Sequence, residues 1–467
     1  MDGVPVILQQ TNIGWSPSYA FTSADLDGDG LHEFLSCPIG VGLLRAFDIT
    51  GRTLWEFRFP SPDRIGEMSI VAADVDGDGR AEVLLPEEEP TNGAIHIVAL
   101  RGDGRVWWRC MLPQGTKWYL ENQVPPLDDA PPDGYASLGA AYAIQPRPGG
   151  RAVRNSILNL ALAWLAGRGH APSIVAFVRG GHLYALTATG EIRWHLAGLG
   201  DEPAHYACTG DLDGDGREEI VVSSSYRRPD GWSAGSLYVV DADVRVRWTA
   251  CVATDITAHD VHVDDALIAP ILPDEPGAQL VTASGGCLFH ATGRRIWRLD
   301  EQLQHGQWVA AGNLLPDHPG REIVLTQFHI VDAPVTLATS DGRIRWHYHR
   351  WHPDTMLSRA CCVDWLGDGR VQIVVGEQAP YFRDAISRRT YDLTVLAGTG
   401  DEIVKLPFED TKRADWYYNG ENSAHVIDID GDGRQEFLFP TMDGRLLIVG
   451  VGDRAWAANT RGRGERR

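Results

Sequence analysis

One nine-residue phrase constrains this chain more than any other feature. It first occurs at residues 25–33 as Asp-Leu-Asp-Gly-Asp-Gly-Leu-His-Glu, and it returns at 74–82, 211–219 and 428–436. Each copy has carboxylates at positions 1, 3, 5 and 9, and a glycine at position 6, where the backbone must turn sharply. Clustered carboxylate oxygens are the ligands that Ca²⁺ prefers. The phrase therefore predicts calcium loops, with several structural Ca²⁺ ions as the expected cofactor.

The predicted metal ligands are the four acidic residues of each copy: Asp25, Asp27, Asp29, Glu33, Asp74, Asp76, Asp78, Glu82, Asp211, Asp213, Asp215, Glu219, Asp428, Asp430, Asp432 and Glu436. A weaker copy adds Asp364 and Asp368, but it lacks the third-position carboxylate and ends at Gln372. The segments 272–277 and 315–320 are interpreted as turns that have dispensed with the ion. An acidic, solvated turn without metal is the alternative for every copy.

The phrase is not expected to form an EF-hand. An EF-hand places a bidentate Glu at position 12 of a loop between two helices. Position 12 is instead Ser36, Leu85, Val222 and Phe439 in the four copies. A short apolar run follows each copy, which is typical of a strand. Each copy therefore predicts a β-hairpin turn held by an ion.

A second phrase follows the loops: a glycine, alternating apolar residues, a polar turn and a strand containing Trp. It occurs at 42–55, 93–108 and 181–194, and later copies end at Trp248, Trp297 and Trp346. Units begin near residues 25, 74, 139, 211, 264, 310, 362 and 426, which makes eight units of four strands. This repeat is typical of propeller blades, with the Trp filling space between them. A linear solenoid is the alternative, but it would need polar capping units at both ends.

The predicted fold is therefore all-β: a single eight-bladed β-propeller of four-stranded antiparallel blades over residues 1–458. The last unit runs out before its fourth strand, and residues 4–8 lie before the first unit. We expect this N-terminal strand to join the last blade and close the ring. Residues 459–467 are expected to be a basic, disordered tail.

Composition excludes several classes of function. The net charge is −21, which makes nucleic acid an unfavourable partner. No segment approaches the roughly 18 apolar residues of a membrane span, so we expect a soluble, monomeric chain without membrane partners. Seven cysteines without paired spacing do not predict a disulfide framework. The start of the chain shows no signal peptide, which fits a cytoplasmic protein or a mature chain whose signal was removed, and the localisation stays open.

In a propeller blade, the first and third turns lie on one face, and the other connections lie on the opposite face. The ion loops are first turns, so the long, irregular connections belong to the opposite face, where a site is expected. Histidines precede several innermost strands there, and a neutral imidazole can accept a proton. For each one alone, a structural histidine is the alternative. These histidines are His205, His259, His262, His305, His352 and His425.

The connections also combine aromatic, basic and amide side chains, which suit sugars: rings stack on pyranose faces and Arg pairs with uronate carboxylates. The candidate substrate-binding residues are Lys117, Trp118, Tyr119, Arg228, Trp232, Arg383, Trp416, Glu421 and Asn422. The expected partner is an acidic plant- or algal-type glycan.

The repeated Asp-x-Asp-Gly-Asp-Gly-x-x-Glu loops resemble those of FG-GAP or VCBS calcium propellers, and within that group the chain looks like the propeller polysaccharide lyases. Those enzymes act on rhamnogalacturonan, ulvan and rhamnosyl-glucuronate linkages. The resemblance implies β-elimination beside a uronic acid, with a base at C5, an acid at the leaving oxygen and a cation at the carboxylate.

For that chemistry the candidate catalytic residues are His205, His425 or His305 as base and Tyr206 or Tyr418 as acid. Arg228, Arg383 or Lys117 would hold the carboxylate. A glycoside hydrolase, with Glu121 and Glu421 as paired acids, is one alternative function. A non-catalytic propeller that binds glycan or protein is the other.

Overall fold

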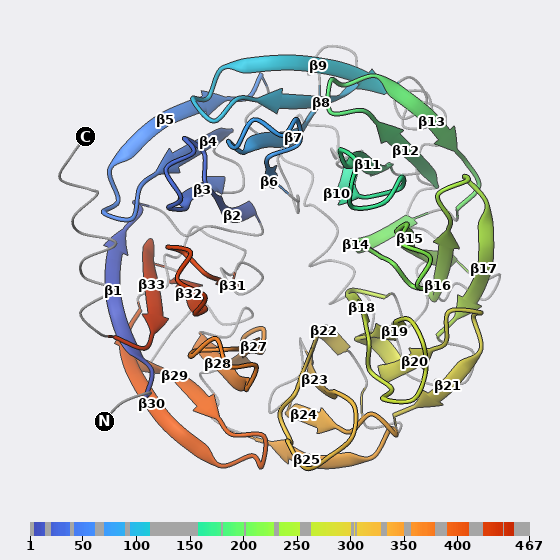
Figure 1. Ribbon diagram of the computed structural model, residues 1–467. Helices are drawn as coiled ribbons and strands as arrows, with labels where there is room; N and C mark the ends of the chain where they lie inside the picture. The colour runs from blue at the N-terminus through green and yellow to red at the C-terminus, as the bar shows by residue number, and fades with distance from the viewer. Residues whose placement is uncertain are drawn as a thin grey trace, which may run out of the picture.

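The computed structural model is a closed ring of eight β-sheets (Figure 1). It describes residues 4–452 except 15–19, 38–41, 61–69, 89–93, 113–156, 179–180, 200–201, 228–232, 253–262, 300–302, 304–305, 328–333, 350–355, 379–389, 411–423 and 442. Apart from the short 3₁₀ turn η2 (Ser284–Gly286), the regular elements of the described residues are strands. No helix among them is long and apolar enough to cross a membrane.

Each sheet is one blade, numbered here from the strands in chain order. Blade 1 is β2 (Ala20–Ala24), β3 (Glu33–Cys37), β4 (Leu43–Phe47) and β5 (Thr53–Arg58). Blade 2 is β6 (Val71–Ala73), β7 (Glu82–Glu88), β8 (Ile95–Leu100) and β9 (Val106–Leu112). Blade 3 is β10 (Ile157–Ala163), β11 (Ser173–Val178), β12 (His182–Leu186) and β13 (Ile192–Leu196). Blade 4 is β14 (Glu202–Gly210), β15 (Glu219–Arg227), β16 (Ser233–Val240) and β17 (Val246–Cys251).

The second half of the ring repeats this pattern. Blade 5 is β18 (Ala266–Ala269), β19 (Gln279–Thr282), β20 (Cys287–Phe289) and β21 (Arg295–Arg298). Blade 6 is β22 (Gly306–Gly312), β23 (Glu322–Gln327), β24 (Val335–Ala338) and β25 (Ile344–Tyr348). Blade 7 is β26 (Met356–Leu357), β27 (Cys361–Val363), β28 (Gln372–Gln378), β29 (Thr390–Leu396) and β30 (Glu402–Glu409). Blade 8 is β31 (His425–Ile427), β32 (Glu436–Pro440), β33 (Arg445–Gly450) and β1 (Val6–Asn12).

The predicted fold and its closure are confirmed. The first strand of each blade lies nearest the ring axis and the last named strand lies at the rim, as Figure 1 shows. The N-terminal strand β1 pairs antiparallel with β33, from Val6 opposite Gly450 to Asn12 opposite Arg445. The first and last parts of the chain therefore share one sheet, which removes the open edges that a linear array would expose.

One predicted boundary is wrong. The third unit has its innermost strand at Ile157–Ala163 and not near residue 139, because this segment pairs with β11 along its whole length. Blade 2 ends at Leu112, so the connection to blade 3 is the long stretch 113–156.

The hydrophobic core is divided among the blade junctions. Eight buried clusters each combine residues of two neighbouring blades, for example Leu35 with Val83 between blades 1 and 2, and Phe21 with Leu438 between blades 8 and 1. Burial of these apolar faces, about 25 cal/mol per Å², is the main force that holds each blade against the next. Among the described residues, six cysteines form no disulfide, and Cys37, Cys287 and Cys361 are buried.

The repeated Trp has the predicted structural role. In five blades, its indole N–H donates to a carbonyl in the third turn of the next blade: Trp55 to Gly102, Trp108 to Ala188, Trp248 to Ala291, Trp297 to Ser340 and Trp346 to Gly398. The indole ring also covers a left-handed glycine that follows the acceptor residue by two positions. A Cβ at Gly190, for example, would lie 2.6 Å from the Trp108 ring.

Blade 4 departs from this pattern. Its third turn carries Val244 at the glycine position, with φ of 66°, where a β-branched residue is strained by about 1–3 kcal/mol. The facing Trp194 packs against the same core cluster as Ala242 of that turn. The junction between blades 3 and 4 is therefore expected to be the least well fitted of the Trp junctions.

We predict that Val244→Gly stabilises the protein by about 1 kcal/mol, because relief of the strained backbone exceeds the entropy that glycine adds to the unfolded chain. The reverse change at a matched turn, Gly190→Val, should destabilise by at least about 2 kcal/mol, since it adds both strain and a clash. Denaturant unfolding of both variants measures this. Equal or opposite effects at the two sites would contradict it.

Candidate metal turns and an axial cluster

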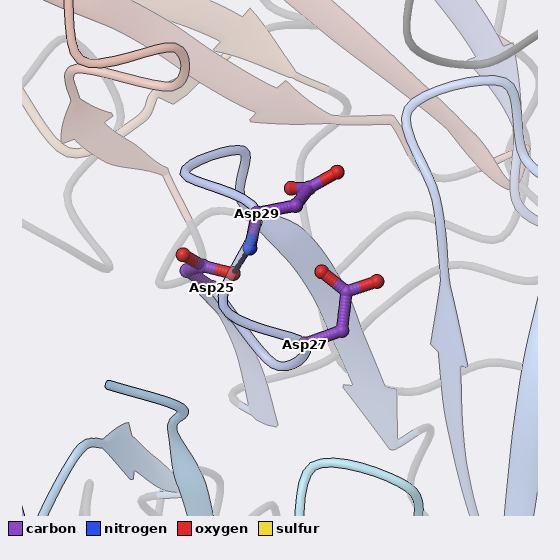
Figure 2. A group of neighbouring side chains, drawn as sticks. All are labelled: Asp25, Asp27 and Asp29. Atoms are coloured by element: carbon purple, nitrogen blue, oxygen red, sulfur yellow. Dashed lines mark hydrogen bonds between the residues drawn. The ribbon is translucent and has the colours of Figure 1, made fainter. Parts of the chain in front are cut away.

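The four acidic loops are the turns between the first and second strands of blades 1, 2, 4 and 8. In each, the position 1 aspartate gathers backbone N–H groups of the turn. Asp25 accepts from Gly28 (2.7 Å) and Asp29 (3.1 Å) at Oδ1 and from Gly30 (2.8 Å) at Oδ2. Figure 2 shows this loop and the bond from Asp29 to Asp25. Asp74 and Asp428 accept the same three bonds, and Asp211 accepts those from the two glycines.

Two glycines make these turns possible. Gly28 and Gly30 have φ of 78° and 85°, and the same two positions are left-handed glycines in the other three loops. The backbone coils around the first aspartate, so the side chains at positions 3 and 5 project from the same turn. The carboxyl groups of positions 1, 3 and 5 come together in blades 1, 2 and 8, and those of positions 1, 3 and 9 come together in blade 4.

The acidic groups fit Ca²⁺. Ligand oxygens within 4.8 Å of one another are offered by Asp25, Asp27 and Asp29, by Asp74, Asp76 and Asp78, by Asp211, Asp213 and Glu219, and by Asp428, Asp430 and Asp432. All are hard, anionic oxygens in a turn fixed by its own N–H groups, which is the donor set that Ca²⁺ takes. A bound ion would neutralise the gathered negative charge.

The position 9 glutamate has a second, structural role that the spacing of the acidic residues does not predict. In all four loops its Oε2 accepts the N–H of position 2: Glu33 from Leu26, Glu82 from Val75, Glu219 from Leu212 and Glu436 from Ile429, at 2.9–3.1 Å. These carboxyl groups are buried. Burial, followed by the charges of Asp430, Asp432 and Asp428, raises the pKa of Glu436 to about 8. A cation in this loop would oppose that shift.

The inner turns are also bonded to one another around the ring. The N–H of position 8 donates to a carbonyl of the preceding blade: His32 to Ile429, Ala81 to Asp25, Glu218 to Trp164, Ala278 to Leu212, Arg321 to Ile271 and Gln435 to Asp364, at 2.9–3.2 Å. The acidic turns of blades 1, 4 and 8 therefore each hold the next blade by a backbone hydrogen bond.

The degenerate turns keep this framework without the full acidic set. Gln279 and Glu322 each accept two backbone N–H groups, from Ile271 and Leu272 and from Leu314 and Leu315. In both segments a side-chain oxygen at the position of the glutamate therefore holds the turn. At the weaker copy, Asp364 accepts bonds from Asp368 and Gly369. The described residues gather no third carboxylate there.

The opposite end of the innermost strands carries a different group of residues. Asp265 directly precedes β18, Arg359 lies in the break between β26 and β27, and His425 begins β31. In each blade the innermost strand runs into the first turn. Residues at the start of that strand therefore lie at the opposite end of the ring, which is where the sequence analysis expects a site. We call Asp265, Arg359 and His425 the axial cluster.

Arg359 and Asp265 bring charge into the ring. The guanidinium Nη2 of Arg359 lies 3.9 Å from Oδ2 of Asp265, across from blade 7 to blade 5. Oδ2 also accepts the N–H of Val309 in blade 6, at 3.1 Å, and Oδ1 accepts that of Ala266. Burial raises the pKa of the Asp265 carboxyl, against the opposing effects of Arg359 and these N–H groups. The sequence interpretation missed both residues, because neither stands in a repeated phrase.

His425 has the environment of a structural histidine. Its Nε2 lies 2.5 Å from the carbonyl oxygen of Phe21, and its ring stacks on the Phe21 ring with centroids 5.3 Å apart. Burial lowers the pKa of His425 to about 4, and the charge of Arg359 adds to this effect. Neutral His425 donates from Nε2, so Nδ1 keeps the lone pair. A base with this pKa is weak at neutral pH.

His205 and Tyr206 lie on an irregular stretch of β14. Pro203 pairs with Ser224 and Ala207 pairs with Val222, so three residues of β14 oppose the single residue Ser223. Bulges re-aim side chains and are frequent beside active sites. The side chains of the pair are outside the described structure, as are the remaining site predictions: Lys117, Trp118, Tyr119, Arg228, Trp232, His305, Arg383, Trp416, Tyr418, Glu421 and Asn422.

Comparison with known proteins supports the fold and one segment of the repeat. A family model described as FG-GAP-like repeat matches residues 25–85, which hold the first two acidic turns. No curated protein sequence matches the chain. Among solved structures, the exotype rhamnogalacturonan lyase YesX aligns with 94% of this chain and 75% of its own, at 14% identity and a TM-score of 0.58. The Dos1 propeller aligns with 96% of both chains, at 11% identity and a TM-score of 0.51. At these identities the likeness extends to the propeller fold alone.

We predict that Ca²⁺ stabilises the protein and that a chelator destabilises it. Free Ca²⁺ at 100 times the dissociation constant adds about 2.7 kcal/mol for each occupied loop. Thermal unfolding with Ca²⁺, with a chelator, and with Mg²⁺ as the control for general ionic effects measures this. A melting temperature indifferent to Ca²⁺ would rule out structural ions.

His425 predicts a pH effect on stability. Its pKa is about 4 in the folded protein and 6.5 ordinarily, so the unfolded chain binds more protons between these values and stability falls as pH drops from 6.5 towards 4. His425→Gln keeps a donor for Phe21 but cannot titrate. It should remove up to about 3 kcal/mol of this pH dependence. His170→Gln, at an exposed histidine, is the control for the loss of an imidazole. Parallel pH profiles for wild type and His425→Gln would contradict the prediction.

Proposed function

We propose that the protein is a polysaccharide lyase that cleaves an acidic, rhamnose- and uronate-containing glycan by β-elimination. The observation that carries the proposal is the axial cluster: a guanidinium and a partly buried carboxyl group from different blades, at the end of the ring opposite the acidic turns. Likeness to an exotype rhamnogalacturonan lyase over 94% of the chain supports the same choice at the level of fold.

The cluster supplies groups that β-elimination needs. A uronate C5–H becomes acidic when a cation neutralises the adjacent carboxylate, and Arg359 is the described cation for that role. The base takes the C5 proton, the bond from C4 to the leaving oxygen breaks, and a C4–C5 double bond forms. The leaving oxygen gains a proton from an acid. Asp265, whose pKa is raised by burial, is suited to hold that proton.

The base is better assigned to His205 than to His425. His425 has its Nε2 committed to Phe21, and its pKa of about 4 makes it a weak proton acceptor. His205 lies in the bulged part of β14, the innermost strand that packs beside β18, which Asp265 precedes. In this proposal His425 holds blade 8 against blade 1 through Phe21, and the charge of Arg359 helps to keep the imidazole neutral.

The test is incubation with rhamnogalacturonan, ulvan and arabinogalactan-type glycans, followed by ultraviolet absorbance of the unsaturated uronate product. We predict that Arg359→Gln lowers kcat/KM by about 100-fold or more, as expected for loss of an electrostatic group at the reacting centre. Arg359→Lys should retain more activity. Arg105→Gln, an arginine on an exposed turn, is the matched control.

Other outcomes separate the remaining functions. Cleavage without a double bond would identify a glycoside hydrolase, and tight glycan binding without cleavage would identify a binding protein. Unchanged activity in Arg359→Gln, with full Ca²⁺ binding and stability, would remove Arg359 from the mechanism.

A further inference from the structure

The innermost strand of blade 7 contains a bulge at the break between β26 and β27. Before the break Leu357 pairs with Glu377, and after it Cys361 pairs with Val374. Three residues of the innermost strand therefore oppose two residues of β28, and the middle one of the three is Arg359. An extra residue of this kind bends a strand and re-aims its side chains.

The packing on either side of the bulge shows its effect. Side chains alternate between the two faces of a regular strand, so residues three apart face opposite ways. Leu357 and Ala360 nevertheless belong to the same apolar cluster, between blades 6 and 7. Cys361 and Val363 belong to the cluster between blades 7 and 8. The bulge therefore reverses the alternation, and Arg359 lies at the point of reversal.

Ser358 closes this bulge with its side chain. In a regular antiparallel pair, two opposite residues can exchange both of their backbone hydrogen bonds. Ser358 donates its N–H to the carbonyl of Gly376 at 2.8 Å, whereas the N–H of Gly376 donates to the Ser358 hydroxyl at 2.9 Å. The same hydroxyl donates to the carbonyl of Arg359 at 3.3 Å. One buried hydroxyl therefore binds the opposite strand and holds the peptide of the arginine.

Gly376 leaves room for this hydroxyl. A Cβ at Gly376 would lie 3.0 Å from Oγ of Ser358 and 2.4 Å from Cε2 of Phe439, a core residue of blade 8. The backbone of β28 can therefore approach both side chains because residue 376 has none of its own. The bulge is thus fixed from both of its strands.

The bulge directs Arg359 past the neighbouring blade. Blade 6 lies between blades 5 and 7 in the ring (Figure 1). A side chain on either face of blade 7 would be directed at blade 6 or blade 8. Nη2 of Arg359 instead lies 3.9 Å from Oδ2 of Asp265, which precedes the innermost strand of blade 5. The guanidinium therefore extends along the inner end of the ring.

We propose that Ser358 is the positioning residue of Arg359, because its hydroxyl holds the bulge that turns the guanidinium towards Asp265. Without the hydroxyl, the N–H of Gly376 is left to the backbone carbonyl of residue 358, as in a regular pair, and the next peptide turns away. The catalytic consequence rests on the proposed function. The effect on the position of Arg359 does not.

The kinetic test compares Ser358→Ala, Arg359→Gln and the double variant. Ser358→Ala should lower kcat/KM by about 10- to 100-fold, as expected for misplacement of a group at the reacting centre. In the Arg359→Gln background the same change should cost less than about twofold, because Ser358 acts through Arg359. The matched control is Ser340→Ala, which removes a buried hydroxyl that donates to Pro319 at the opposite end of the ring. It should leave kcat/KM unchanged in both backgrounds.

A crystal structure of Ser358→Ala gives a readout that needs no activity. We expect the N–H of Gly376 to bond to the carbonyl of residue 358. The distance between Arg359 and Asp265 should increase from 3.9 Å to beyond the range of an ion pair. Thermal unfolding should show that Ser358→Ala and Ser340→Ala both remain folded.

The outcomes separate this inference from the proposed function. Additive losses in the double variant, an Arg359 that does not move, or failure of Ser358→Ala to fold would each overturn the positioning role. A wild type without lyase activity, together with a displaced Arg359 in the Ser358→Ala structure, would overturn the proposed function and leave the positioning role in place.

Discussion

The ring depends on how the inner turns are fastened. Each acidic turn fixes the peptide at its second position with the position 9 glutamate. In blades 1, 4 and 8 the next blade also donates an N–H to the first or second carbonyl of the turn. One short segment thus shapes its own hairpin and orients the next blade. Apolar burial between blades supplies most of the stabilising free energy, but it is not directional. The turns provide the direction.

The same turns bring several carboxylates close together, and the blades differ in how this negative charge is balanced. Gathering carboxylates in one turn costs free energy unless a cation balances them. Arg101 and Arg247 provide part of that balance in blades 2 and 4, whereas the turns of blades 5 and 6 retain the hydrogen bonds with fewer acidic groups. Framework and charge are therefore separable: the hydrogen bonds recur in turns that have lost the acidic set.

The inner turns supply the hydrogen bonds that orient the blades. The opposite ends of the innermost strands do not carry this role, and several of them are irregular. Register shifts occur there in blades 3, 4 and 6, and blade 7 has a break that carries Arg359. A regular strand would present alternating side chains in fixed directions. The break in blade 7 carries Arg359, whose guanidinium approaches Asp265 of blade 5, and the proposed chemistry depends on that approach.

The sequence by itself determined the eight-bladed ring, its closure by the N-terminal strand, the Trp junctions and the positions of the acidic turns. These features follow from short-range spacing that repeats along the chain. Only the tertiary structure decided that His425 is committed to Phe21, that Asp265 meets Arg359, and that Arg101 and Arg247 enter two of the four acidic loops. Those contacts join residues of different blades or different strands, and they do not recur in every blade. They depend on the register and curvature of the closed ring, which a repeated spacing in the sequence does not specify.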